Sequence, residues 1–143
     1  MAVTGAHAPI VITHHGGVKF AAKIRKHRVL VDQPTGCGGE DSAPMPIELL
    51  GAALGTCIAY YVREYLHARD LPYEGMRVEV EQRGAKDPAR IAQFVARIIL
   101  ASELPAHHME LLERVARSCP AHGTFVHGAE VDVRLEVPSA VGA

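Results

Sequence analysis

The sequence has no tryptophan, few other aromatic residues and almost no net charge. Aromatic residues make up 5% of the 143 residues, and the formal net charge is -1. A chain so close to neutrality produces no long-range field that would gather a polyanion. We therefore expect neither nucleic acid nor a membrane surface among its partners.

Export signals and membrane-spanning runs are also missing. Residues 1–10 have neither the basic start nor the apolar core of a signal peptide. The longest apolar stretch, residues 46–66, contains charged side chains and glycines, which favours a buried helix over a bilayer span. The cytoplasm is the expected location.

Cysteine is scarce as well. The chain contains Cys37, Cys57 and Cys119, an odd number in a protein expected in the cytoplasm. Structural disulfides are rare in that compartment, so thiol chemistry is the more natural role for these residues.

What the chain does contain is a regular order of periodic segments. Its length suits one domain over residues 1–143, and strand and helix patterns alternate along it. The expected elements are an N-terminal antiparallel meander (11–13, 18–24 and 27–31), a long helix (46–68), a hairpin (76–82 and 90–101, with a turn at 84–88), a second helix from 105 and a last strand (130–137).

Cys57 lies about midway along the long predicted helix. At about 100° per residue, it shares one side of that helix with Leu50, Ala53, Leu54 and Tyr61. A cysteine in such an apolar setting is either a small core residue or a buried reactive thiol.

Cys119 has a different context. Pro120 stops the preceding helix and can begin a new turn, which Gly123 is expected to end. Backbone N–H groups at a helix N-terminus favour a thiolate, and His122 could donate or accept a proton there. The alternative is a capped turn whose thiol has no chemical role.

Together the two cysteines form a candidate redox pair. A thiol oxidised to a sulfenic acid needs a second approachable sulfur to form a disulfide. Whether their α-carbons come within about 6 Å, as a disulfide requires, depends on the fold.

Residues 46–57 and 118–124, which contain Cys57 and Cys119, carry a resemblance to the OsmC/Ohr family, nearer its general OsmC-like group than its Ohr branch. Residues 46–57 (PIELLGAALGTC) resemble the family's central-helix motif, and residues 118–124 (SCPAHGT) resemble its second cysteine motif. Residues 32–34 and 38–39 are also similar, so the resemblance covers about residues 20–137. It implies an α+β OsmC-like fold and an intertwined homodimer, with the central helices packed together and active sites where the subunits meet.

The resemblance also implies a reaction. Cys57 would attack an organic or fatty-acid hydroperoxide, and Cys119 would resolve the oxidised sulfur as a disulfide. A dithiol or lipoyl-type reductant would then restore both thiols, with no metal or other cofactor. The role would be oxidative-stress defence.

One position departs from the Ohr branch, which pairs an arginine with a glutamate directly after the helix-opening proline. Ile47 occupies that position, and Glu48 follows it. Glu48 lies roughly opposite Cys57 on the helix, so we expect it to stabilise the helix N-terminus. Arg25 and Arg28 are the candidate arginines, although neither follows a glycine.

Three questions stay open at this level. Gly51 and Gly55 share a helix face that suits either a helix of another subunit or crowding within the chain. Cys37, surrounded by glycines, is either a bystander or a site of regulatory oxidation. The whole chain could instead be a binding module that holds zinc or an apolar ligand between protomers, through Cys57, Cys119 and His122.

Overall fold

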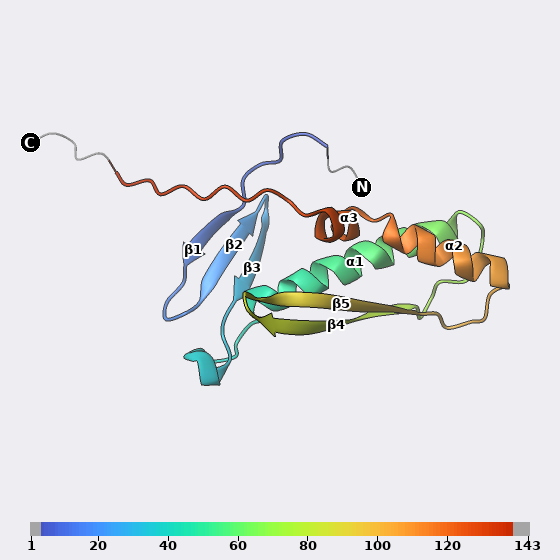
Figure 1. Cartoon of the computed structure of the whole chain (residues 1–143), viewed down its shortest axis with the longest axis horizontal. Coiled ribbons are helices and arrows are strands. Elements are labelled where there is room, and N and C mark those ends of the chain that lie inside the picture. The colour runs from blue at the N-terminus through green and yellow to red at the C-terminus, as the bar shows by residue number, and fades with distance from the viewer. Residues whose placement is uncertain (1–3, 139–143) are drawn as a thin grey trace, which may run out of the picture.

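A computed structural model describes residues 4–138 and has the predicted α+β class (Figure 1). The elements in chain order are β1 (Val11–His14), β2 (Phe20–Ile24), β3 (His27–Val31), a 3-10 turn (Thr35–Cys37), α1 (Pro46–His67), β4 (Arg77–Lys86), β5 (Ala89–Ile99), α2 (Ala106–Arg117) and α3 (Pro120–His127). In residues 4–138, no helix has the length and apolar character needed to span a membrane.

The centre of the molecule is a helical body made of α1, β4, β5, α2 and α3. Helix α1 contacts each of the other four elements, and the hairpin and the two shorter helices gather around it (Figure 1). The three- and four-residue spacing of apolar side chains in the sequence creates the face that α1 buries. The resulting core comprises Leu54, Cys57, Ile58, Val62, Tyr65, Leu66, Leu112, Ala116 and Cys119.

The β4–β5 hairpin is longer than the sequence pattern predicts. Strand pairing runs from Arg77 opposite Ile99 to Lys86 opposite Ala89, so the connecting turn is Asp87–Pro88 rather than residues 84–88. An irregularity between Arg83 and Gly84 shifts the register there, and pairing then continues beyond it. The glycine therefore marks a bulge within the strand, a common place for glycine, and not its end.

The N-terminal sheet (β1–β3) is the predicted antiparallel meander. Ile12, Ala22 and Val29 lie opposite one another across the three strands and share a face. Among residues 4–138, no helix packs extensively against either face of this sheet. Ile12 is 57% exposed as a result.

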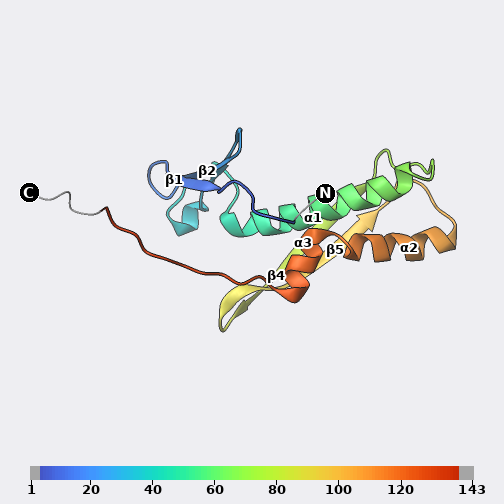
Figure 2. The ribbon, with the colours of Figure 1, turned by 90° about the horizontal axis from the view of Figure 1, so that it is seen from above.

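The predicted last strand is wrong for the isolated chain. Residues 128–138, here called the C-terminal arm, have no regular secondary structure and extend away from α3 (Figures 1 and 2). Their alternating apolar side chains are 77–92% exposed: Val131, Val133, Leu135 and Val137. The alternation has the period of a strand, but a strand also needs a neighbouring edge for its backbone hydrogen bonds.

A buried carboxylate organises the loop that joins the N-terminal sheet to α1. Asp32 is fully buried and accepts hydrogen bonds from the backbone N–H groups of Gln33, Glu40 and Ser42, and from the Ser42 hydroxyl. These donors, those of Ser42 above all, hold the pKa of Asp32 well below its usual range. The loop between the two regions is therefore pinned at its start.

Candidate active site

Cys57 projects from the middle of α1 at the edge of its buried face. Its thiol is 7% exposed and belongs to the core, with Leu54 and Ile58 as buried neighbours on the helix. Leu50 and Ala53, which the helical spacing places on the same side, are exposed. The surroundings of Cys57 are thus apolar, but one flank of the helix beside it is uncovered.

Cys119 is the N-cap residue of α3. Its side chain is 1% exposed, and its Sγ accepts a hydrogen bond from the backbone N–H of His122 at 3.3 Å. Pro120 begins the helix, as its fixed backbone angle favours. The prediction that Gly123 ends this turn is wrong. The helix continues to His127 and is followed by Gly128, whose φ of 76° suits a helix stop.

The fold brings the two thiols together. Cys57 and Cys119 are both free and lie in one buried cluster. Burial raises the pKa of the Cys119 thiol, and the neighbouring Cys57 sulfur raises it further. The backbone N–H groups of His122 and Ala121 act in the opposite direction without reversing the shift. The thiolate expected at this helix end is therefore not favoured, because desolvation outweighs the helix N-terminus.

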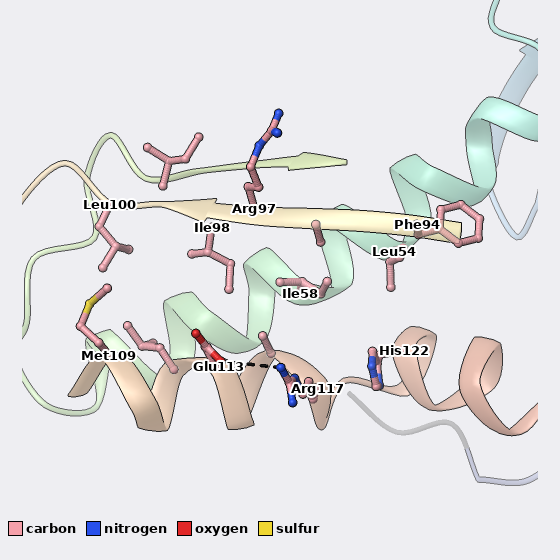
Figure 3. A pocket seen from close by; sticks show the side chains of 14 residues that line it. Leu54, Ile58, Phe94, Arg97, Ile98, Leu100, Met109, Glu113, Arg117 and His122 are labelled. Carbon is pink, nitrogen blue, oxygen red and sulfur yellow. Dashed lines mark ion pairs between the residues drawn. The ribbon is translucent and has the colours of Figure 1, made fainter. Parts of the chain in front are cut away.

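An apolar cavity of about 640 Å³ lies beside the pair, between α1, β5 and α2 (Figure 3). Its apolar lining includes Leu54, Ile58, Phe94, Ile98, Leu100, Met109, Leu112 and Ala116. Neither thiol lines this cavity, but the helix neighbours of Cys57 do, and so does His122. The cavity therefore reaches the immediate surroundings of both sulfurs.

Charged side chains stand at the border of the cavity. Arg97 points away from it, toward the exposed face of the hairpin, where it pairs with Glu79 (Figure 3). Glu113 and Arg117 form an exposed i,i+4 ion pair on α2. The interior offered to a ligand is consequently mostly apolar, with His122 as a polar side chain in its lining.

The other predicted site residues lie elsewhere. Glu48 caps α1 by accepting the backbone N–H of Met45 at 2.8 Å, the structural role expected for it. Arg25 occupies the β2–β3 turn with a φ of 55°, and Arg28 contacts the His15 ring at 3.2 Å. Both arginines belong to the N-terminal sheet, so within one chain neither is brought to the thiol pair.

The two glycines of α1 pack against the hairpin of their own chain. A Cβ atom on Gly55 would lie 2.9 Å from Cγ2 of Val80, and one on Gly51 would lie 2.9 Å from Nε2 of Gln82. The Gln82 side chain also donates a hydrogen bond to the carbonyl of Ile47 at 2.9 Å. Crowding within the chain therefore accounts for the glycines. Sequence reasoning missed Gln82 because nothing in a strand pattern indicates which helix its side chain meets.

Two alternatives gain no support from the arrangement. Among residues 4–138, no cluster of three or more His, Cys, Asp or Glu side chains is placed to hold a metal ion. Zinc held by Cys57, Cys119 and His122 of one chain is thus disfavoured. Cys37 is exposed on the loop, outside the core that holds the other thiols.

Known structures share this arrangement. A protein from Psychrobacter arcticus 273-4, named for osmotic stress induction and detoxification response, is 20% identical, with a TM-score of 0.76 over 86% of this chain and 91% of its own. An OsmC-like protein from Mycoplasma pneumoniae is 15% identical, with a TM-score of 0.73 over 86% and 89% of the two chains. An organic hydroperoxide resistance protein from Legionella pneumophila is 20% identical, with a TM-score of 0.55 over 85% and 91%. These similarities establish the fold.

Comparison with curated protein sequences finds no match. The family model described as "OsmC-like protein" matches residues 39–134, which include α1, the hairpin, α2, α3 and both buried cysteines. Since this match covers more than half of the chain, the chain belongs to the OsmC-like protein family.

Proposed function

We propose that this protein is a thiol-dependent peroxidase that reduces organic, lipid-type hydroperoxides in oxidative-stress defence. The observation that carries the proposal is the meeting of two free thiols, Cys57 and Cys119, from different helices in one buried cluster. Family membership and the name of the Legionella pneumophila neighbour support a general stress or redox role.

The reaction uses the two sulfurs in order. The Cys57 thiolate attacks the terminal peroxide oxygen, the O–O bond breaks, and the alcohol leaves with a proton from the site. Cys119 then attacks the sulfenic sulfur of Cys57, and water leaves as the disulfide forms. A dithiol or lipoyl-type reductant exchanges with this disulfide and restores both thiols. One peroxide is reduced for each dithiol oxidised.

Burial supports this order of events. Cys57 is the less buried sulfur, and its neighbours Leu54 and Ile58 line the cavity, so an incoming peroxide meets Cys57 first. Burial raises the pKa of Cys119, which disfavours its thiolate and suits this cysteine to the second, resolving step. The apolar lining of the cavity suits the hydrocarbon part of a lipid-type hydroperoxide.

The test is turnover of cumene or linoleic acid hydroperoxide with a dithiol or lipoamide reductant. Cys57→Ser should reduce consumption of peroxide to the rate without protein, because a serine hydroxyl cannot act as the thiolate. Cys37→Ser is the matched control and should retain turnover. Unchanged turnover in Cys57→Ser would refute the proposal.

We also propose that the working form is an intertwined homodimer. The N-terminal sheet is uncovered, the C-terminal arm is unpaired and alternates apolar with polar side chains, and Ala53 and Tyr60 are exposed near Cys57 on α1. A second copy could pair with the arm and cover the flank of α1 beside the thiol. The arginine missing from the site of one chain could then come from the N-terminal sheet of the other.

A second candidate function rests on the cavity alone. A protein of this fold could hold an apolar ligand in the space between α1, β5 and α2 without turning it over. Binding of a saturated fatty acid by wild type and Cys57→Ser, measured by calorimetry, together with absence of peroxide turnover in wild type, would favour this reading.

A further inference from the structure

Helix α3 packs on α1 and α2 but buries none of its own residues completely. Its Ala121 packs against the core, and its Phe125 ring lies with a centroid 4.8 Å from that of Phe94. Its first turn depends on Cys119, whose sulfur caps the helix by accepting the His122 N–H. A short helix that buries little of its surface is sensitive to its cap.

The capping sulfur is also the sulfur assigned to the disulfide. In the reduced protein Cys119 Sγ lies against both the His122 N–H and the Cys57 thiol. Bond formation with Cys57 draws this sulfur toward α1 and sets its position by the disulfide geometry. A sulfur so constrained, and only a weak acceptor, no longer caps the first turn of α3.

We propose that oxidation of the Cys57–Cys119 pair removes the cap of α3, so that the redox state of the site controls the order of this helix and of the arm that follows it. The inference rests on the disulfide of the proposed function. Each oxidation converts two thiols to a disulfide, with the hydroperoxide reduced to alcohol and water as above. The oxidised protein therefore has a looser α3 than the reduced protein.

Coupling of this kind acts in both directions. If oxidation loosens α3, any change that stabilises α3 must also make the disulfide harder to form. Gly123 offers such a change, because a Cβ atom there would meet nothing within 4 Å and its φ is not positive. Gly123→Ala should stabilise α3 without touching either sulfur.

The first experiment measures amide hydrogen exchange by NMR in a Cys37→Ser background, with the thiols reduced or oxidised by diamide. The amide of His122 should exchange about two- to fivefold faster in the oxidised protein, as expected for the loss of a cap. The amide of Leu112 in α2 is the internal reference and should not change. Cys57→Ser should show no response of His122 to diamide.

The second experiment measures the fraction of disulfide in a fixed dithiol–disulfide buffer. Gly123→Ala should lower the ratio of oxidised to reduced protein by about two- to fivefold. Gly36→Ala is the matched control, since a Cβ atom there also meets nothing and the residue lies on the loop; it should leave the ratio unchanged.

The outcomes separate this inference from the peroxidase proposal. Because diamide forms the disulfide without peroxide, the response of α3 is measured whether or not the protein consumes hydroperoxide. A disulfide confirmed by intact mass with unchanged exchange at His122 would overturn the inference and leave the peroxidase intact. Failure of the disulfide to form even with diamide would overturn both the coupling and the resolving role of Cys119.

Discussion

The helical body and the ends of the chain use similar apolar sequence with opposite results. In the body, apolar side chains at helical spacing meet one another, and Val62 and Leu66 are completely buried. In the N-terminal sheet and the C-terminal arm, apolar side chains at strand spacing remain exposed, Leu135 by 92%. The difference shows that the body buries its own apolar surface, whereas the ends leave theirs uncovered within residues 4–138.

The largest effect should come from the centre of the body. Leu66→Ala should lower the free energy of unfolding by about 2–5 kcal/mol, because it removes fully buried methyl groups and leaves a cavity. Leu50→Ala, on the same helix but 39% exposed, should cost no more than about 1 kcal/mol. Urea denaturation measures both, and equal losses would contradict the assignment of the core.

The loop that joins the N-terminal sheet to α1 should make the stability of the fold depend on pH. The pKa of Asp32 is lowered in the folded protein, so its carboxylate stabilises the fold above the unfolded pKa of about 3.9, and this stabilisation is lost as the pH falls toward the folded value. Asp32→Asn should therefore be less stable than wild type at pH 7, by less than the loss in Leu66→Ala. The difference in the free energy of unfolding between the two proteins should narrow below pH 4. Denaturation at pH 7, 4 and 3 tests this, and a gap that stays constant would contradict it.

Substitutions in the C-terminal arm should change self-association without affecting the helical body. The double variant Val133→Asp with Leu135→Asp places charges on the apolar face of the arm and should weaken a homodimer by at least about tenfold. Glu130→Lys, on the alternate positions of the arm, is the control and should change association little. Sedimentation velocity over a range of concentrations measures both. A wild-type chain that stays monomeric at every concentration would remove the homodimer proposal.

The smallest expected effect is a difference in stability between alanine substitutions at the two glycines of α1. Gly55→Ala forces a methyl group against the branched Val80 side chain and should lower stability by about 1 kcal/mol, after its gain in helix propensity is included. Gly51→Ala meets only the flexible end of Gln82 and should be close to neutral. Thermal unfolding compares them. If Gly51→Ala were the more damaging, the glycine face would be packed by something other than β4.

Local patterns predicted the elements of this fold well. Pro46 and the apolar spacing of α1 mark where that helix begins and which face it buries. The same rules failed at Gly84 and Gly123, which lie inside a strand and a helix. A glycine permits a stop but does not impose one when pairing or helix hydrogen bonds can continue through it.

The candidate site was predicted in part. The sequence identified Cys57, Cys119 and the capping role of Glu48, and the structure places the two thiols in one core. It did not identify the roles of Asp32 and Gln82 or the cavity between β5 and α2. It also overestimated how far the helix N-terminus lowers the pKa of Cys119. Each of these depends on burial or on contacts between distant segments, which no local pattern contains.

The sequence by itself determined the order of the elements as far as the second helix, and the two cysteines on which the proposed chemistry rests. Those properties follow from periodicity, from the backbone limits of proline, and from the rarity of thiols in the chain. Only the tertiary structure decided that burial raises the pKa of Cys119, that the glycines of α1 meet β4, and that the arm pairs with no strand within residues 4–138. Desolvation, close packing and backbone pairing depend on neighbours that are distant in sequence and close in space. Only the fold brings such neighbours together.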